Sequence, residues 1–299
     1  MNHIQLRENI KNFSLDDGPR GNQGFNRVLL QLFGLPGHGK SSLINSCKYV
    51  LEDGGPFFEY AKVGRPDRVE TMVRRSYQLT DTITLVDNRG CPKMNNFETA
   101  EIYAQLGNFL PLDIGVVWRE SYSDVVSNLE QAEMEPNESD LIIPVFVYNV
   151  KHSIPEEGIA ELSSFITNCR LMTGVYPIIV LTNKHSADYL TLEKTFRRMR
   201  AEVVMTVENY TNEDHMKTLG RTTDILKFID SALNNAKYLM EQPRNPKKDR
   251  IGRRLFLLNH IHDAKLAQQE EQIRKEEEQR AKRNQTNTSF WRKLFRHKQ

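Results

Sequence analysis

The chain has 299 residues, of which 38% are hydrophobic and 27% are charged. This length can hold one large domain or two small ones, and the low hydrophobic share indicates that part of the chain stays outside a packed core. Three scattered cysteines, Cys47, Cys91 and Cys169, fit a reducing compartment rather than a disulfide framework. The first residues contain no apolar signal region, and no run approaches the ~18 apolar residues of a membrane span. We therefore expect a cytoplasmic protein.

The net charge of +2 hides an asymmetry between the body of the chain and its tail. Residues 244–299 contain 16 Lys and Arg against seven Asp and Glu, whereas residues 1–243 contain 25 against 32. A basic tail is attracted to an anionic surface or to the acidic face of its own body. The location that we expect therefore includes a peripheral position at a membrane surface.

A phosphate-binding loop follows the first predicted strand. Residues 1–25 are polar and include the turn-forming run Asp16–Gly24, so a flexible lead-in is expected there. A buried strand is predicted at Arg27–Phe33 and a helix at Ser41–Val50. Between them, Gly34–Ser41 fits the pattern G-x-x-x-x-G-K-[ST] without a gap. The backbone N–H groups of such a loop, and the positive end of the helix, converge on the phosphates of a nucleotide.

The residues of this loop divide the binding of phosphate and metal between them. Gly34 and Gly39 permit backbone geometry that a Cβ atom would block. Lys40 is expected to reach the β- and γ-phosphates, and the Ser41 hydroxyl to bind Mg²⁺. His38 is predicted to face solvent, with the orientation of an attacking water as its alternative role. The predicted nucleotide contacts in this segment are Gly34, Gly37, His38, Gly39, Lys40, Ser41 and Ser42.

Strands and helices alternate along the rest of the chain. Strands are predicted at Thr71–Leu79, Thr82–Val86, Leu141–Val150, Val175–Thr182 and Glu202–Val207. Helices are predicted at Phe97–Leu110, near Tyr122–Glu133, and at Glu156–Met172 and Asp188–Arg200. Glu213–Met240 is predicted to form one long helix or two short ones. This order predicts a three-layer α/β fold of the P-loop NTPase type, like a small GTPase, with a mainly parallel central sheet and helices on both faces.

The Pro-containing stretch Gln242–Lys248 marks a predicted domain boundary. It separates a nucleotide-binding domain at 26–242 from a basic, helix-prone extension at 243–299. Apolar residues between Asp263 and Arg283 are too sparse to sustain a coiled-coil seam. A charged, solvated single helix is therefore expected in the extension.

A second phosphate-site signal closes the strand Thr82–Val86. The run Asp87-Asn88-Arg89-Gly90 has the form D-x-x-G, which is by itself a common turn. In a P-loop protein, an acidic residue at this strand end holds Mg²⁺, often through water. A glycine three residues later lets its N–H approach the γ-phosphate. We therefore predict Asp87 as a metal ligand and Gly90 as a phosphate contact.

These motifs make residues 25–240 resemble the GTPase branch of the P-loop proteins. The resemblance rests on Gly34–Ser41, Asp87–Gly90, the run Thr182-Asn183-Lys184 at a later strand end, and the order of the elements. It implies GTP or GDP with Mg²⁺ as ligands, and it places Asn183 and Lys184 beside the base.

The same resemblance implies catalytic roles for Lys40 and Thr71. Thr71 would be the switch threonine, whose hydroxyl binds Mg²⁺ together with Ser41 and Asp87 when the γ-phosphate is present. The alternative is an ordinary threonine at a strand edge. Thr80 and Thr82 are weaker candidates for the same role.

A narrower resemblance is to the interferon-induced protein 44 family. It is carried by Lys40–Asn45, by Thr71 and the run Arg75-Ser76-Tyr77 that lead into the Asp87 strand, and by Val207–Glu213. This family would make the chain a GTPase-like nucleotide-binding switch.

The chain departs from the GTPase pattern at two positions. GTPases of this branch commonly read guanine with N/T-K-x-D, but here Ser186 stands where the aspartate is expected. Asp188 is two residues late and fits a helix-start acid beside a Ser186 N-cap. Cys91 occupies the position of the usual water-orienting Gln after D-x-x-G. We therefore predict modest discrimination of GTP over ATP and slow intrinsic hydrolysis.

The C-terminal segment Phe290–Lys298 has the composition of a contact element. On a helix, Phe290 pairs with Leu294 and Trp291 pairs with Phe295 along one stripe. Such a short basic amphipathic segment fits weak peripheral membrane contact or a protein partner, including self-association. The alternatives are docking onto the chain's own domain and plain disorder. Nucleic acid is not expected, because no recognised binding fold accompanies the charge.

Three functional hypotheses remain open from the sequence. The leading one is a guanine-nucleotide-binding switch with slow hydrolysis, in which Mg²⁺ lies on Ser41 and Asp87 and the γ-phosphate orders residues near Thr71 and Gly90. The second is a scaffold protein that keeps the fold but binds nucleotide weakly or constitutively. The third is a P-loop kinase-type transferase, for which Arg197, Arg198 and Arg200 are the candidate arginine cluster.

Overall fold

The computed structural model describes residues 2–52, 54–62, 71–90, 96–117, 121–134, 138–186 and 188–296. Within these ranges, side chains are described except at residues 71, 72, 96, 97, 116, 117, 157 and 284–296. The chain divides into two compact units, Met1–Leu257 and Leu258–Gln299. No helix in the described part of the chain has the length and apolar composition that crossing a bilayer requires.

A six-stranded sheet forms the centre of the first unit. Its strands lie in the order β3 (Arg75–Gln78), β4 (Ile83–Asp87), β1 (Arg27–Phe33), β6 (Asp140–Asn149), β7 (Ile178–Thr182) and β8 (Val204–Thr206). All neighbours pair in parallel except β3, which runs antiparallel to β4. A separate antiparallel pair joins β2 (Thr71–Val73) to β5 (Gly115–Val117).

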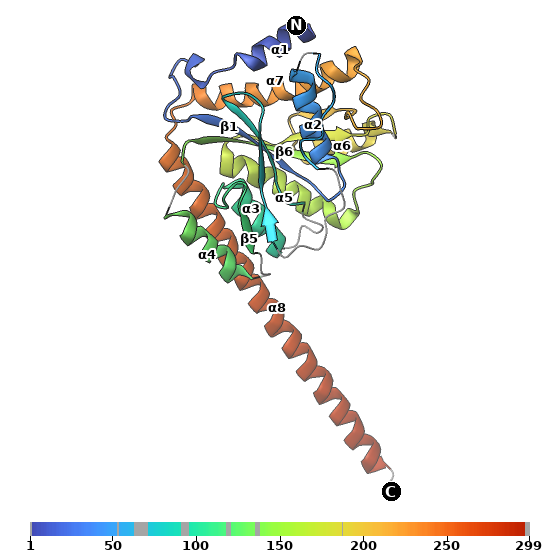
Figure 1. Cartoon of the computed structure of the whole chain (residues 1–299). Helices are drawn as coiled ribbons and strands as arrows, with labels where there is room; N and C mark the ends of the chain where they lie inside the picture. The colour runs from blue at the N-terminus through green and yellow to red at the C-terminus, as the bar shows by residue number, and fades with distance from the viewer. Residues whose placement is uncertain are drawn as a thin grey trace. The chain divides into compact units, whose positions relative to one another are not determined.

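Helices cover both faces of the large sheet (Figure 1). One face carries α1 (His3–Lys11), α2 (Lys40–Leu51) and α7 (Leu219–Glu241). The other carries α3 (Asn96–Leu106), α5 (Glu156–Thr173) and α6 (Tyr189–Arg198), and α4 (Tyr122–Ala132) lies beside α3. The predicted fold class, a three-layer α/β fold of the P-loop NTPase type, is confirmed.

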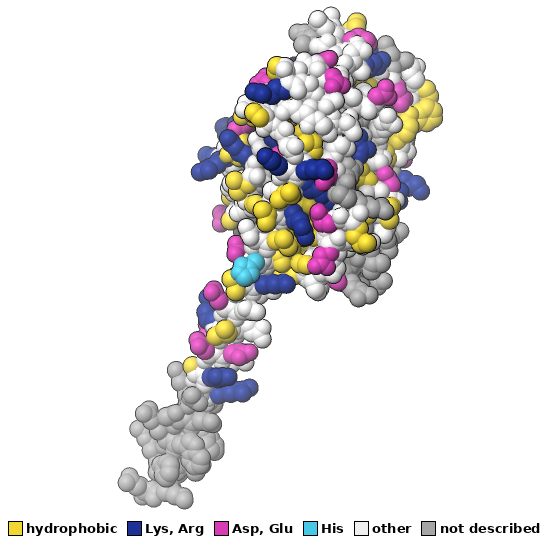
Figure 2. Space-filling view, turned by 90° about the vertical axis from the view of Figure 1, so that its left-hand side faces the viewer, with side chains coloured by type: hydrophobic (Ala, Val, Ile, Leu, Met, Phe, Trp, Pro, Cys, Tyr) yellow, Lys and Arg dark blue, Asp and Glu magenta, His cyan; other side chains and the backbone are white. Residues whose placement is uncertain are grey.

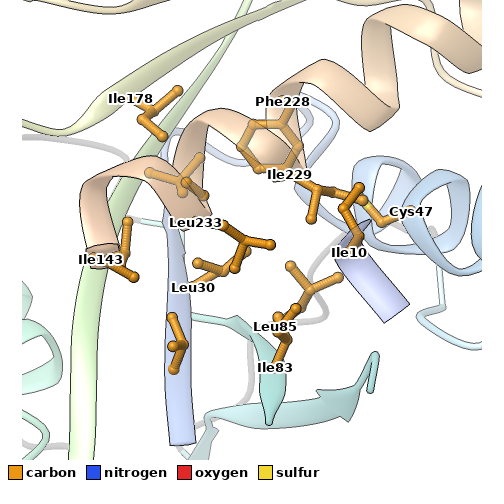
Figure 3. Close-up of a cluster of buried hydrophobic side chains, with 14 of the residues drawn as sticks. Ile10, Leu30, Cys47, Ile83, Leu85, Ile143, Ile178, Phe228, Ile229 and Leu233 are labelled. Carbon is orange, nitrogen blue, oxygen red and sulfur yellow. The ribbon is translucent and has the colours of Figure 1, made fainter. Parts of the chain in front are cut away.

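The central strands are buried on both faces, as continuous apolar runs in parallel strands predict. Along β1, Val28, Leu30 and Leu32 pack toward α1, α2 and α7, whereas the Phe33 ring contacts Phe165 of α5 at a centroid distance of 5.9 Å. Figure 3 shows the first of these layers, in which side chains from β1, β4 and β6 meet those of α1, α2 and α7. This two-sided core fixes the carboxyl ends of the parallel strands, where the candidate site lies.

The N-terminal stretch differs from the flexible lead-in that the sequence suggested for residues 1–25. The helix α1 begins after Asn2, whose side chain accepts a hydrogen bond from the Gln5 N–H at 2.8 Å. Leu6 and Ile10 are buried in the core, and α1 packs against α7. A nine-residue helix is marginal alone in water, so this one depends on a partner that lies more than 200 residues later in the sequence.

The strand predicted at Thr71–Leu79 is divided in two at Arg74. The residues before it, β2, pair with β5, whereas those after it, β3, join the large sheet. The Arg74 side chain is 1% exposed and donates from Nε to Asn88 Oδ1 at 2.9 Å and from Nη2 to Gln31 Oε1 at 3.2 Å. A charged side chain directed inward at this position ends the regular pairing of the strand.

The helix α8 (Pro246–Arg296) begins in the first unit and forms the second. In the first unit, Arg250 and Arg253 are buried and donate to the carbonyls of Asn108 and Gly107. In the second unit, acidic and basic side chains lie close together along the described part of the helix (Figure 2), and Lys275 pairs with Glu271 at 2.6 Å. Such i,i+4 pairs support a solvated helix.

Candidate phosphate and nucleotide site

The loop between β1 and α2 adopts a backbone that only glycine tolerates at three positions. Gly34, Gly37 and Gly39 have φ values of 141°, 78° and 93°. A Cβ atom on Gly34 would lie 2.3 Å from the Val147 carbonyl oxygen, so the loop also passes too close to β6 for any side chain. Gly39 immediately precedes α2, so the free N–H groups of the first helical turn face the loop.

The Lys40 ammonium lies inside the curve of this loop. It donates to the carbonyl oxygens of Gly34 at 3.0 Å and Leu35 at 3.3 Å. The residue is 8% exposed. A buried cation that is held by neutral carbonyls is well placed to exchange them for the oxygens of an anion.

Ser41 and Asp87 meet at the mouth of the loop. Because β4 pairs with β1 in parallel, Asp87 is aligned with Leu32 and ends its strand next to the start of α2. The Ser41 hydroxyl donates to Asp87 Oδ2 at 2.7 Å. Burial raises the pKa of Asp87, and the Lys40 charge and the Ser41 hydrogen bond oppose that rise. A hydroxyl and a carboxylate of this kind are hard oxygen ligands that fit Mg²⁺, which takes its other ligands from phosphates and water.

The turn after Asp87 lies against the glycine-rich loop Gly34–Ser41. A Cβ atom on Gly90 would lie 3.0 Å from Lys40 Nζ and 3.0 Å from the Pro36 nitrogen, so glycine permits this approach. The helix α3 anchors the turn, since Arg89 Nη1 donates to Glu101 Oε2 at 2.8 Å and the Arg89 N–H donates to Gln105 Oε1 at 3.1 Å.

Two charged side chains next to this turn, Glu101 and Arg74, have pKa values shifted from their ordinary values. Burial raises the pKa of Glu101 to about 7, although the neighbouring Arg89 charge lowers it. Burial likewise lowers the pKa of Arg74 to about 9, although Asp140 and Asp113 raise it. Arg74 donates to Asn88 and so supports the turn from the side of the core. The sequence analysis did not predict this role for Arg74, because arginines at strand edges are common.

His38 does not face solvent, so that prediction is wrong. Its side chain is buried, and its Nδ1 accepts a hydrogen bond from the Asn149 N–H at 3.2 Å. Its ring stacks on His152 at a centroid distance of 4.9 Å and meets Tyr148 edge-on at 4.7 Å. Burial, followed by the charges of His152 and Lys40, lowers the pKa of His38 to about 4. His38 therefore joins the phosphate loop to the end of β6 as a neutral ring.

The loops after β7 and β8 lie beside the phosphate loop. Thr182 Oγ1 donates to the His38 carbonyl at 2.9 Å, and Asn209 Nδ2 donates to the Gly39 carbonyl at 3.3 Å. Asn183 has a φ of 59°, which turns the chain out of β7. Lys184 Nζ donates to Asp224 Oδ2 of α7 at 2.8 Å. The structure thus brings Asn183 and Lys184 to the same edge of the sheet as Lys40, Ser41 and Asp87.

Asp188 is a helix-start acid, as the sequence predicted, but Ser186 is not the N-cap. The Asp188 side chain itself caps α6 by accepting from the Leu190 N–H at 3.0 Å. The Ser186 N–H instead donates to the Asn183 carbonyl at 2.9 Å.

Several predicted residues fall outside what the structure describes. Cys91 lies outside the described residues. The side chain of Thr71 is not described, although its backbone belongs to β2. The backbone of the C-terminal segment is helical through Arg296, whereas its side chains are not described. The roles proposed for these residues stay predictions.

The fold and this arrangement define a P-loop NTPase-like domain. No protein-family model matches the chain, and no curated protein matches it. The solved structure of an oligomerised bacterial dynamin pair, described as a mechanism for long-range sensing and tethering of membranes, is similar over 98% of this chain at 13% identity and a TM-score of 0.32. The chain spans half the length of that protein. A likeness at this level supports no conclusion about function, and the interferon-induced protein 44 resemblance stays a prediction.

Proposed function

We propose that the protein is a guanine-nucleotide-binding switch that uses Mg²⁺ and hydrolyses GTP slowly. The observation that carries this proposal is the convergence of Lys40, Ser41 and Asp87 on one point at the mouth of a glycine-rich loop. Lys40 and the loop N–H groups would bind the phosphates, while Ser41 and Asp87 would bind the metal. The narrower proposal, a place in the interferon-induced protein 44 family, rests on the sequence resemblance alone.

The approach of Gly90 to Lys40 supports a switch rather than a passive site. An entering phosphate would draw the Lys40 ammonium away from the Gly34 carbonyl, and Gly90 lies against both groups. The turn Asp87–Gly90 would therefore respond to the presence of the γ-phosphate. Thr71 is proposed to join the metal in that state.

The scaffold alternative is favoured by one observation. Lys40 and Ser41 are satisfied by groups of the chain itself, so the loop does not need a nucleotide to complete its hydrogen bonds. The transferase alternative has less support, because Arg197 is paired with Glu193 at 2.8 Å rather than free to bind a phosphate.

Replacement of Lys40 tests the phosphate site directly. Lys40→Ala removes a charge-assisted contact, so the affinity for Mg²⁺–GTP should fall about ten- to a hundredfold, as measured by calorimetry. Lys48→Ala is the matched control, because Lys48 lies in the same helix and donates to the Gln78 carbonyl away from the loop. Equal affinity in the Lys40→Ala and wild-type proteins, or no nucleotide binding by the wild type, would refute the proposal.

Replacement of Asp87 tests the metal. Asp87→Asn keeps an oxygen for the Ser41 hydroxyl but removes the negative charge that Mg²⁺ requires. The wild type should bind GTP more tightly with Mg²⁺ than with EDTA, and this difference should largely disappear in the variant. A difference of unchanged size would show that the metal, if used, is held elsewhere.

A further inference from the structure

The sequence lacks the aspartate that GTPases of this branch use to read guanine, but the structure places a carboxylate from another element beside Lys184, the lysine that we predict to contact the base. Asp224 lies in α7, and its Oδ2 accepts a hydrogen bond from Lys184 Nζ at 2.8 Å. Both side chains are 28% exposed, so a ligand can reach the pair. We infer that Asp224 supplies the carboxylate that recognises the guanine edge in place of the residue missing at Ser186. This inference rests on the proposed nucleotide binding.

The position of the pair matches where a base must lie. The phosphate loop is joined to the end of β7 through Thr182 and to the loop after β8 through Asn209. A nucleotide whose phosphates occupy the loop extends its ribose and base past these two contacts. Lys184 follows Thr182 by two residues, and its aliphatic stem can cover one face of a purine while its ammonium stays paired.

Three other carboxylates near Lys184 or α7 are engaged in local structure. Asp188 caps α6, and Asp214 pairs with Arg221 at 2.9 Å. Glu208 accepts a hydrogen bond from the His185 N–H at 3.1 Å, which fixes the loop after β7. Asp224 differs from all three, because its polar partner among the described residues is a flexible side chain rather than backbone or an arginine clamp.

The chemistry of a carboxylate explains how the protein would discriminate guanine from adenine. Guanine presents two adjacent donors, N1–H and the exocyclic N2–H, which the two oxygens of one carboxylate can accept together. Adenine presents an unprotonated N1 at the same edge, so its lone pair would face the negative charge. With Asp224 in this role, the protein should prefer GTP over ATP clearly, rather than modestly as the sequence alone suggested.

Replacement of Asp224 by Asn gives a test with a specific signature. Xanthine keeps the N1–H donor but carries an acceptor oxygen at position 2, which an amide N–H can bind and a carboxylate repels. The wild type should bind Mg²⁺–GTP at least about tenfold more tightly than Mg²⁺–ATP or Mg²⁺–XTP. Asp224→Asn should reverse the GTP-to-XTP preference by a similar factor, measured by competition against one fluorescent nucleotide.

Two further variants make the result decisive. Asp230→Asn is the matched control, because Asp230 is on α7 but bonds to Asn234 of its own helix; it should leave the ratio of GTP to XTP affinities unchanged. Glu208→Gln tests a competing carboxylate, which contacts the residue after Lys184. A ratio of affinities within one variant does not depend on how much of the protein is folded, so a loss of stability cannot imitate the reversal.

The outcomes separate the inference from the proposed function. If the wild type binds no nucleotide, the proposed function fails and the inference fails with it. If the wild type binds GTP and Asp224→Asn keeps the wild-type ratio, the inference is refuted while the proposed function stands. If Glu208→Gln reverses the preference instead, the reading residue is Glu208 and the assignment of Asp224 is wrong.

Discussion

A buried histidine in the glycine-rich loop Gly34–Ser41 makes the stability of the fold depend on pH. The Nδ1 of His38 accepts a hydrogen bond from the Asn149 N–H, so protonation of Nδ1 would place two N–H donors face to face. The pKa of His38 is about 4 in the folded chain against an ordinary value of 6.5. Between these two values the unfolded chain binds a proton that the folded chain does not. His38 therefore does not reduce the free energy of unfolding above about pH 6.5, and the free energy of unfolding falls as the pH decreases from there toward 4.

The His38 effect can be isolated by a substitution. His38→Gln keeps an acceptor for Asn149 but cannot titrate, so its unfolding free energy should fall less than that of the wild type on acidification. The difference should reach at most about 3 kcal/mol, measured by urea unfolding of the nucleotide-free protein at several pH values. His185→Gln, at an exposed position, should follow the wild type. Parallel curves for wild type and His38→Gln would show that His38 does not contribute.

Arg74 should be among the most sensitive residues of the fold. Its guanidinium is fully buried and binds the side chains of Gln31, Asn88 and Asn108. Arg74→Ala would remove the buried donors that these amide oxygens share, although Gln31 keeps its bond from Asn88 Nδ2, and it should cost about 3 kcal/mol or more of unfolding free energy. The exposed neighbour is the control, since Arg75→Ala should change stability by less than about 0.5 kcal/mol. Chemical denaturation of both variants measures this difference. Equal unfolding free energies for Arg74→Ala and Arg75→Ala would contradict the prediction.

At the scale of elements, the turn Asp87–Gly90 is held in place by α3. The sequence of the turn alone does not reveal this contact. Glu101 and Gln105 of α3 anchor Arg89, and the pKa of Glu101 is raised to about 7. The anchoring charge on Glu101 is therefore about half present near pH 7, largely present by about pH 8, and lost as the carboxylate takes up a proton at lower pH.

This anchor predicts a pH-dependent effect of Glu101→Gln. Near pH 8 the variant lacks a charge that the wild type has, so backbone amides of the turn should exchange hydrogen faster than in the wild type. Near pH 6 the wild-type side chain is mostly protonated, so the two proteins should exchange alike when compared at the same pH. Identical exchange in both proteins at the higher pH would show that the Arg89–Glu101 pair does not hold the turn.

At the scale of the whole molecule, the C-terminal segment should be separable from the nucleotide site. The residues that form the site lie within the first compact unit. Truncation after Arg283 should therefore leave GTP affinity unchanged in calorimetry. It should also reduce sedimentation with anionic liposomes at low salt, because it removes Phe290–Lys298 and its basic charge. Loss of nucleotide binding on truncation, or no liposome binding by the full chain, would contradict this separation.

The features that local patterns encode could be predicted from the sequence, and those that depend on distant partners could not. Arg27–Phe33 and Gly34–Ser41 carry their structure in adjacent residues, so the strand and the loop agree with prediction. The helix α1 was missed because its apolar residues are too few to indicate burial without α7. Asp224, whose role is our inference, was not predicted because it lies 40 residues after Lys184 in the second turn of α7, where no local motif marks a ligand-facing acid.

The central position of β1 has a consequence for how the chain reaches this structure. Within the sheet, β1 lies between two strands: Arg27 is aligned with Asp140 of β6 and Val28 with Ile83 of β4. Before β1, Gln23 Nε2 donates to the Met240 carbonyl. During synthesis, the first strand and α1 therefore emerge long before any of these partners. Folding dominated by such distant pairings is slow and leaves apolar surface exposed in the meantime. The N-terminal segments should consequently be the part of the nascent chain that most needs a chaperone until α7 has left the ribosome.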